Sequence, residues 1–439
     1  MNHDLKIYNT LTQSIEPFES IQKGIVNMYV CGPTVYDHIH IGNARPVIVF
    51  DTIKRILKAF GYHVNMVSNI TDVDDKIIDK AKQLNVSEEE ITKEYIQAYE
   101  MITKRLGSEL PDHMPKATQY VKEMIRYIQT LIDKGYAYET HHGVYFRVHK
   151  VDDYGILSKQ NQDQLETAVR VSLDEEKEHP RDFSIWKKTT DGLHFASPWG
   201  PGRPGWHTEC AVMNHEIFNG MIDIHGGGSD LMFPHHENER AHARAHDHHG
   251  LAKYWMHNGR LDLDAKKMSK SLGNVIFVKD LKENHLKAFR MLILAHHYRQ
   301  PIQYSESLFE EYVKIYSNIE KKLKMTSLEL NTEKIHTDDI LEDEKQKTYD
   351  ILAKDFDTPN LITEIYHMIK TLNKAGTSIS KAVLLNTIKW QLSILGLDID
   401  THTTEEVVQV YQDWQAARAN KQYEIADELR KKLMEKGYL

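Results

Sequence analysis

The chain has little of what marks a secreted or membrane protein. Its 439 residues include only two cysteines, Cys31 and Cys210, which excludes a disulfide framework. It lacks any run of 18 apolar residues, and its opening residues, MNHDLKIYNT, do not form a signal peptide. We therefore expect a cytoplasmic protein without a membrane segment, in a compartment where the two thiols stay reduced.

The chain also lacks an excess of positive charge. It has 55 lysines and arginines against 64 aspartates and glutamates, a formal net charge of −9. Any nucleic-acid partner must therefore meet local basic patches on a chain that is acidic as a whole. The length allows two to four domains, and the 41% hydrophobic and 27% charged content is that of a globular protein.

Two β-type runs with a helical pattern between them occupy residues 27–68. This order is a βαβ unit and predicts a parallel sheet, with Asn43 capping the helix and Gly61 ending it. The loop before the helix reads His40-Ile41-Gly42-Asn43. Gly42 leaves room for a ligand beside the backbone, and the helix N-terminus attracts phosphate. The stretch indicates a nucleotide site of a non-Walker kind.

A second motif, Lys267-Met268-Ser269-Lys270-Ser271, lies far downstream. Two lysines three residues apart, among small hydroxyl residues, can place flexible positive charges on a polyphosphate. Together the two motifs resemble the HIGH and KMSKS signatures of class I aminoacyl-tRNA synthetases. The last HIGH position is Asn43 here, which keeps a hydrogen-bond donor and loses the chance of a positive charge.

This resemblance and the hydrophobic pattern together predict the architecture. We expect an α/β protein with a Rossmann-like parallel-sheet catalytic domain, an inserted connective domain, and an all-α helical-bundle C-terminal region. The expected boundaries are 1–125 and 198–255 for the two halves of the catalytic domain, 126–197 for the insertion, 256–308 for a KMSKS and stem-contact region, 309–400 for the bundle, and 401–439 for a short anticodon-region helix.

Four residues could bind a metal: Cys31, Cys210, His235 and Glu239. His235 and Glu239 are four residues apart and would share one helix face. Two thiolates, an imidazole and a carboxylate suit tetrahedral Zn²⁺. Because no C-x-x-C pair is present, spacing alone leaves ordinary buried thiols open as well. The absence of an H-E-x-x-H motif disfavours a zinc protease.

Four further stretches resemble the cysteinyl-tRNA synthetase family over residues of about 5–310. They are VCGPTVYD at 30–37, GWHTEC at 205–210, DIHGGGSD at 223–230 and HHENE at 235–239. The resemblance implies that Cys31, Cys210, His235 and Glu239 hold one zinc ion. It also implies ATP with Mg²⁺, L-cysteine and tRNA(Cys) as substrates, and we expect a monomer.

The resemblance also implies roles for single residues. The phosphates of ATP would meet His40, Asn43, Lys267 and Lys270. The adenylate would lie against Gly42, His225, Gly227 and Asp230, and the cysteine pocket would include Thr71 and Trp206. Trp206 could instead be core packing, and the glycines a plain turn. A last group, expected to be exposed helix and turn residues rather than a second metal site, is His242, His246, His248 and His249.

The implied reaction has two steps. Cysteine is activated by ATP to cysteinyl-adenylate, and the cysteinyl group then passes to the terminal ribose of tRNA. Zinc would select the substrate thiolate, because a hydroxyl is a harder and less acidic ligand. Two alternatives are a ligase that joins the adenylate to a sugar amine and a silent paralogue that binds tRNA or stores zinc. The helical region after residue 305 and the intact lysines argue against them.

Overall fold

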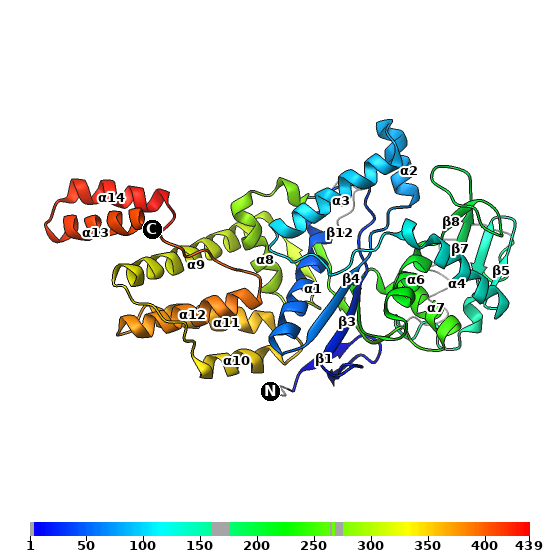
Figure 1. Cartoon of the computed structure of the whole chain (residues 1–439), viewed down its shortest axis with the longest axis horizontal. Coiled ribbons are helices and arrows are strands. Elements are labelled where there is room, and N and C mark those ends of the chain that lie inside the picture. The colour runs from blue at the N-terminus through cyan, green and yellow to red at the C-terminus, as the bar shows by residue number, and fades with distance from the viewer. Residues whose placement is uncertain (1–3, 160–175, 264–265, 268–274) are drawn as a thin grey trace.

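A four-stranded parallel sheet carries the N-terminal half of the fold. The computed structural model describes residues 4–159, 176–263, 266–267 and 275–439. The sheet is parallel, as the βαβ pattern predicted, and has the strand order β10–β9–β3–β4; β3 and β4 are labelled in Figure 1. Its strands are buried on both faces because helices cover them. Their bounds are Ile25–Val30 (β3), His63–Ser68 (β4), Ile222–Gly228 (β9) and Ala252–Asn258 (β10).

Helix α1, Ile41–Ala59, joins β3 to β4 and begins earlier than predicted. The cap is His40, whose Nδ1 accepts a hydrogen bond of 3.2 Å from the Asn43 backbone N–H. The prediction that Asn43 caps the helix is therefore wrong, because a ring nitrogen can satisfy the first turn in place of an amide. Gly61 follows the helix at a φ of +91°, a conformation that glycine adopts without strain.

The helical region after β4 is divided into two helices. It contains α2, Asp75–Leu84, and α3, Glu88–Arg105. Asn85 ends α2 in the left-handed conformation, and Ser87 starts α3 with a capping box. Asp74 caps α2, so this acid has a structural role.

A second sheet, with the antiparallel order β5–β6–β7–β8, is inserted between the halves of the parallel sheet. It extends past residue 197, the expected end of the insertion, because β8 pairs with β7. One core cluster joins this sheet to α4 and to residues of α6 and α7. The bounds are Val121–Asp133 (α4), Ala137–Glu139 (β5), Gly143–Phe146 (β6), Phe183–Lys188 (β7), Gly202–Pro204 (β8), Trp206–Phe218 (α6) and Glu237–Asp247 (α7).

Smaller strands complete the catalytic region. A hairpin of β1 and β2 precedes β3, and a three-stranded sheet of order β12–β11–β13 follows β10. Their bounds are Lys6–Asn9 (β1), Ser14–Pro17 (β2), Leu261–Leu263 (β11), Lys266–Lys267 (β12) and Ile302–Tyr304 (β13).

The C-terminal part is helical, as the pattern after residue 305 predicted. The single helix expected over 401–439 is wrong: this region holds two helices, α13 and α14, which pack on α9 through a separate small core (Figure 1). In the described part of the chain, no helix combines the length and apolar character needed to cross a membrane. The bounds are Leu286–Leu294 (α8), Glu306–Thr332 (α9), Glu342–Leu352 (α10), Thr358–Leu372 (α11), Ser378–Ile394 (α12), Glu405–Ala419 (α13) and Tyr423–Glu435 (α14).

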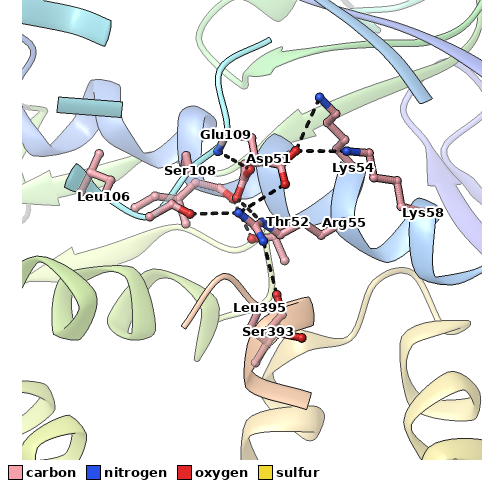
Figure 2. A network of polar contacts seen from close by, with 12 residues as sticks. Asp51, Thr52, Lys54, Arg55, Lys58, Leu106, Ser108, Glu109, Ser393 and Leu395 are labelled. Atoms are coloured by element: carbon pink, nitrogen blue, oxygen red, sulfur yellow. Dashed lines mark hydrogen bonds and ion pairs between the residues drawn. The ribbon is translucent and has the colours of Figure 1, made fainter. Parts of the chain in front are cut away.

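One buried arginine joins the catalytic sheet to the bundle. Arg290 of α8 donates to the carboxylate of Asp51 on α1 at 2.5 Å, to Ser108 Oγ at 2.8 Å and to the Leu395 carbonyl at 2.7 Å. Its partners lie on α1, on the segment after α3 and just after α12 (Figure 2). The same network therefore sets the position of α1 against α8 and the bundle.

Candidate active site and metal centre

A cavity of about 370 Å³ opens where β3, β9 and β10 end. It is lined by the segment after β3, by the first turn of α1, and by residues that follow β9 and β10. Ligands of open parallel sheets collect at this edge. Of the predicted site residues, the cavity lining includes Cys31, His40, Gly42, Asn43, Trp206 and Asp230.

The four predicted metal ligands meet at one side of this cavity. Cys31 Sγ lies 3.9 Å from Cys210 Sγ and 3.3 Å from Glu239 Oε1, and His235 Nε2 lies 3.0 Å from the same Glu239 oxygen. Their potential ligand atoms all lie within 4.8 Å of one another. Cys210, His235 and Glu239 are buried, whereas Cys31 is partly exposed toward the cavity.

Three different parts of the fold supply these ligands. Cys31 follows β3, Cys210 lies in α6, and Glu239 lies in the first turn of α7. His235 precedes α7 by two residues and lies against the imidazole of His207, with 2.9 Å between their Nδ1 atoms. His207 was missed as a contributor, although it stands inside the GWHTEC stretch.

The electrostatics of the cluster fit a bound cation. Burial raises the pKa of the Cys31 thiol, and its contact with Cys210 adds to this. Burial acts to raise the pKa of Glu239 too, but its contacts with His225 and His235 hold it below its usual range. Burial lowers the pKa of His235 to about 3, which keeps its ring neutral and able to bind a metal. A divalent cation is the partner that would let the buried thiols ionise, so this donor set fits Zn²⁺.

His225 lies with this cluster and is absent from the cavity lining. It is fully buried and stacks on Tyr29, and its Nε2 lies 3.6 Å from Cys31 Sγ and 3.2 Å from Glu239 Oε2. A second set of potential ligands, Cys31, His225, His236 and Glu239, shares two members with the first. His225 therefore lies behind the metal ligands and outside the cavity wall, and its expected place beside the adenylate stays a prediction.

Gly227 has a similar position behind the cavity. Its neighbours Gly228 and Asp230 line the cavity, whereas a Cβ added to Gly227 would lie 2.9 Å from the ring of His236. The lack of a side chain at Gly227 thus makes room for a buried histidine.

The two predicted cysteine-pocket residues differ in exposure. Trp206 is 41% exposed, lines the cavity and stacks on His235 with ring centroids 4.0 Å apart, so it is not core packing. Thr71 is buried and does not line the cavity; its hydroxyl donates to Glu209 at 2.9 Å. Its backbone N–H donates to the Pro33 carbonyl and so supports the loop after Cys31.

The HIGN motif lies at the start of α1. His40, Gly42 and Asn43 line the cavity there, while Lys267 pairs through its backbone with Asp262 in the β11–β12 hairpin. Lys270 lies outside the described residues. Residues 276–278 pair with the residues around the start of α1: Ile41 N–H donates to the Ile276 carbonyl, and Val278 N–H donates to the Ile39 carbonyl. The segment that follows the KMSKS motif is therefore held against HIGN.

The remaining histidines only partly match the expectation of exposed residues. His248 is exposed, but His242 is fully buried between Asn238 and Thr208, so that expectation is wrong for it. His246 lies against Asp247 and His215.

Comparisons with known proteins agree with these features. A family profile described as "tRNA synthetases class I (C) catalytic domain" matches residues 17–314. A cysteine-tRNA ligase of Acholeplasma laidlawii is 50% identical over 438 residues, covering 99% of this chain and 100% of that protein. One from Staphylococcus carnosus is 42% identical over 449 residues, covering 98% and 96%.

Solved structures show the same fold at low identity. Mycobacterium tuberculosis methionyl-tRNA synthetase in complex with methionyl-adenylate aligns with a TM-score of 0.59 and 14% identity over 85% of this chain and 90% of that one. An Agrobacterium radiobacter LeuRS in a ternary complex aligns with a TM-score of 0.64 and 12% identity over 87% and 84%. The chain belongs to the class I aminoacyl-tRNA synthetases and, among them, to the cysteine-tRNA ligases.

Proposed function

We propose that this cysteine-tRNA ligase selects its amino acid through one zinc ion held by Cys31, Cys210, His235 and Glu239. The observation that carries the proposal is the convergence of these four ligand atoms within 4.8 Å at the wall of the cavity. When bound, zinc would supply a soft Lewis acid that prefers the thiolate of cysteine to the hydroxyl of serine. Pocket shape alone separates such similar side chains by only about 1–3 kcal/mol.

In this proposal, protein side chains position the amino acid. Trp206 covers the substrate side of His235 and holds its ring by stacking. Cys31 faces the cavity and lies nearest to the incoming thiol, while Thr71 supports the loop that carries Cys31. His225 and His207 lie behind the ligands and hold Glu239 and His235 in place.

Activation by ATP rests on the start of α1 and on the KMSKS lysines. His40, Gly42 and Asn43 would meet the phosphates from one side, with the helix N-terminus adding favourable charge. Lys267 and Lys270 would approach from the other side, and Mg²⁺ would share the phosphate charge. Asp230 and Gly228 would lie against the adenylate. Catalysis then consists mainly of positioning and charge stabilisation.

The helical C-terminal region would bind tRNA. Helices α9 to α12 form the platform, and α13 and α14 present exposed basic side chains toward the anticodon region. These side chains are Arg418, Lys421, Arg430, Lys431 and Lys432. We also expect a monomer located in the cytoplasm.

The test compares cysteine with serine in the full chain and in Cys210→Ser. We expect wild type to charge tRNA with cysteine and to bind one cavity zinc, and a chelator to abolish charging. Cys210→Ser should lose this zinc and at least about 100-fold of its kcat/KM for cysteine. Val212→Thr, a buried polar replacement in the same helix, is the matched control and should keep both. A Cys210→Ser protein that retains cavity zinc and discrimination would contradict the proposal.

A further inference from the structure

A second group of metal-binding side chains lies at the far ends of α6 and α7. It consists of His215, His246 and Asp247, whose potential ligand atoms all lie within 4.8 Å of one another. His246 Nδ1 is 2.7 Å from Asp247 Oδ1, and His215 Nδ1 is 3.1 Å from Asp247 Oδ2. All three are partly buried, with side-chain exposures of 16–27%. The carboxylate is thus held between two imidazoles from two helices.

The surroundings of the group orient its rings. Tyr127 of α4 stacks on His246 with ring centroids 3.8 Å apart and meets His215 edge-on at 5.6 Å. A third imidazole is within reach, because His249 Nε2 lies 4.0 Å from Asp247 Oδ2. Rings fixed by an aromatic neighbour need little reorganisation to bind an ion.

The local charge also favours a cation. The group stands at the C-terminal ends of α6 and α7, where the partial charge of a helix is negative. Burial acts to raise the pKa of Asp247, but its hydrogen bond to His246 and the nearby histidines hold it below the usual range. The cationic side chains close by, Lys134 and Arg244, donate to the carbonyls of His246 and His248. Among the described residues, the ion pairs of Asp247 are with histidines alone.

We propose that His215, His246 and Asp247, with His249 as a fourth ligand, form a second binding site for a divalent cation of the zinc class. Imidazole and carboxylate ligands suit Zn²⁺ and the metals that share its ligand preference. The site is separate from the cavity cluster, since His215 lies five residues after Cys210 in α6 and His246 seven residues after Glu239 in α7. At 1.5 Å per residue these steps correspond to about 8 and 10 Å along the helices.

The bound ion would hold together the two helices that carry Cys210 and Glu239. Helix α6 and helix α7 pack against each other near the cavity, and the second site would join them at their opposite ends. The role is therefore structural, and the inference does not depend on the proposed cysteine selection.

The test counts bound cobalt in the full chain, because Co²⁺ occupies zinc sites and reports its ligands by absorption. Wild type dialysed against Co²⁺ should bind two equivalents, one of which shows a thiolate-to-cobalt charge-transfer band. His215→Gln should lose one equivalent and keep that band. Cys210→Ser should lose the band and keep one equivalent. His248→Gln, at an exposed neighbouring position, should behave as wild type.

The proposal is overturned if wild type binds a single equivalent that shows the charge-transfer band, or if His215→Gln still binds two. A His215→Gln protein that fails to fold is recognised by loss of the charge-transfer band. In that event His249→Gln is the deciding variant. The proposal requires it to bind the second cobalt equivalent at least tenfold more weakly than wild type, with the charge-transfer band unchanged. Absence of the band from every protein, with the second equivalent retained, would instead contradict the cavity site alone.

Discussion

Buried histidines show how single residues of this protein respond to pH. His242 is fully buried; its Nδ1–H donates to the Asn238 carbonyl at 2.7 Å, and the Thr208 hydroxyl lies 3.3 Å from Nε2. Both contacts suit the neutral ring. Burial consequently lowers the pKa of His242 to about 4.

We predict that His242 makes the folded protein less stable in acid. Its folded-state pKa is below the unfolded value of about 6.5, so the unfolded chain takes up the proton first as the pH falls. The stabilisation is present above pH 6.5 and is lost between about pH 6.5 and 4, amounting to roughly 2 kcal/mol between pH 7 and 5. Urea unfolding of His242→Gln should show a smaller fall in the free energy of unfolding over this range. Equal pH dependence in wild type and His242→Gln would refute the prediction, and His248→Gln is the exposed control.

Gly32 is the residue whose lack of a side chain most directly shapes the metal cluster. A Cβ at this position would lie 1.7 Å from the Asn69 carbonyl oxygen. We predict that Gly32→Ala shifts the end of β3, moves Cys31 and weakens zinc binding, and that it lowers stability by about 1–3 kcal/mol or more. Metal content and thermal unfolding measure both effects. Gly376→Ala, where a Cβ meets nothing within 4 Å, should be neutral; normal zinc content in Gly32→Ala would show the argument to be wrong.

At the scale of elements, Arg290 decides how α1 lies against α8 and the bundle, through contacts with Asp51, Ser108 and Leu395, which Figure 2 labels. Both Arg290 and its partner Asp51 are buried, and Asp51 also accepts from the Glu109 backbone N–H at 2.8 Å. Helix α1 begins at His40 beside the cavity. A shift of α1 would therefore reach the phosphate-binding turn.

We predict that Arg290→Met destabilises the protein by about 3–5 kcal/mol, because it leaves buried Asp51 paired with Arg55 alone and leaves Ser108 and the Leu395 carbonyl without their buried donor. Denaturant unfolding measures the loss. The control is Arg105→Met, which breaks an ion pair to Glu283 whose side chains are 27% and 70% exposed, and which should cost less than about 1 kcal/mol. Similar losses in the two variants would rule out a special role for Arg290.

At the scale of the whole molecule, the cavity and the helices proposed to bind tRNA lie at different ends of the structure. The cavity lies at the parallel sheet, whereas α13 and α14 form a separate end with a core of their own (Figure 1). A chain with a net charge of −9 needs local basic surfaces to meet tRNA.

We predict that reversing the charges of Arg430 and Lys431 to glutamate weakens tRNA binding and leaves activation intact. The KM for tRNA should rise about tenfold and its salt dependence should weaken by about one phosphate contact per lysine or arginine removed. Cysteine-dependent exchange of pyrophosphate into ATP should not change. Reversal of Lys93 and Lys104, exposed on α3 and outside the proposed tRNA platform, changes the net charge equally and should have little effect. An unchanged KM for tRNA in the Arg430 and Lys431 variant would show that α14 does not contact tRNA.

Local sequence patterns were sufficient to predict much of the fold and of the candidate site. The sequence alone determined the α/β class, the βαβ unit around HIGN and the helical C-terminal region, because these depend on the period of apolar residues along contiguous segments. It also singled out Cys31, Cys210, His235 and Glu239, since their chemistry and motifs can be recognised before their distances are known.

Only the tertiary structure decided which residues meet across distant segments. In the structure His225 lies behind the metal cluster and His40 caps α1. The last region forms two helices, α13 and α14, and His215 lies beside His246 and Asp247. Packing between elements far apart in the chain sets these outcomes, and no local period or short motif encodes such contacts.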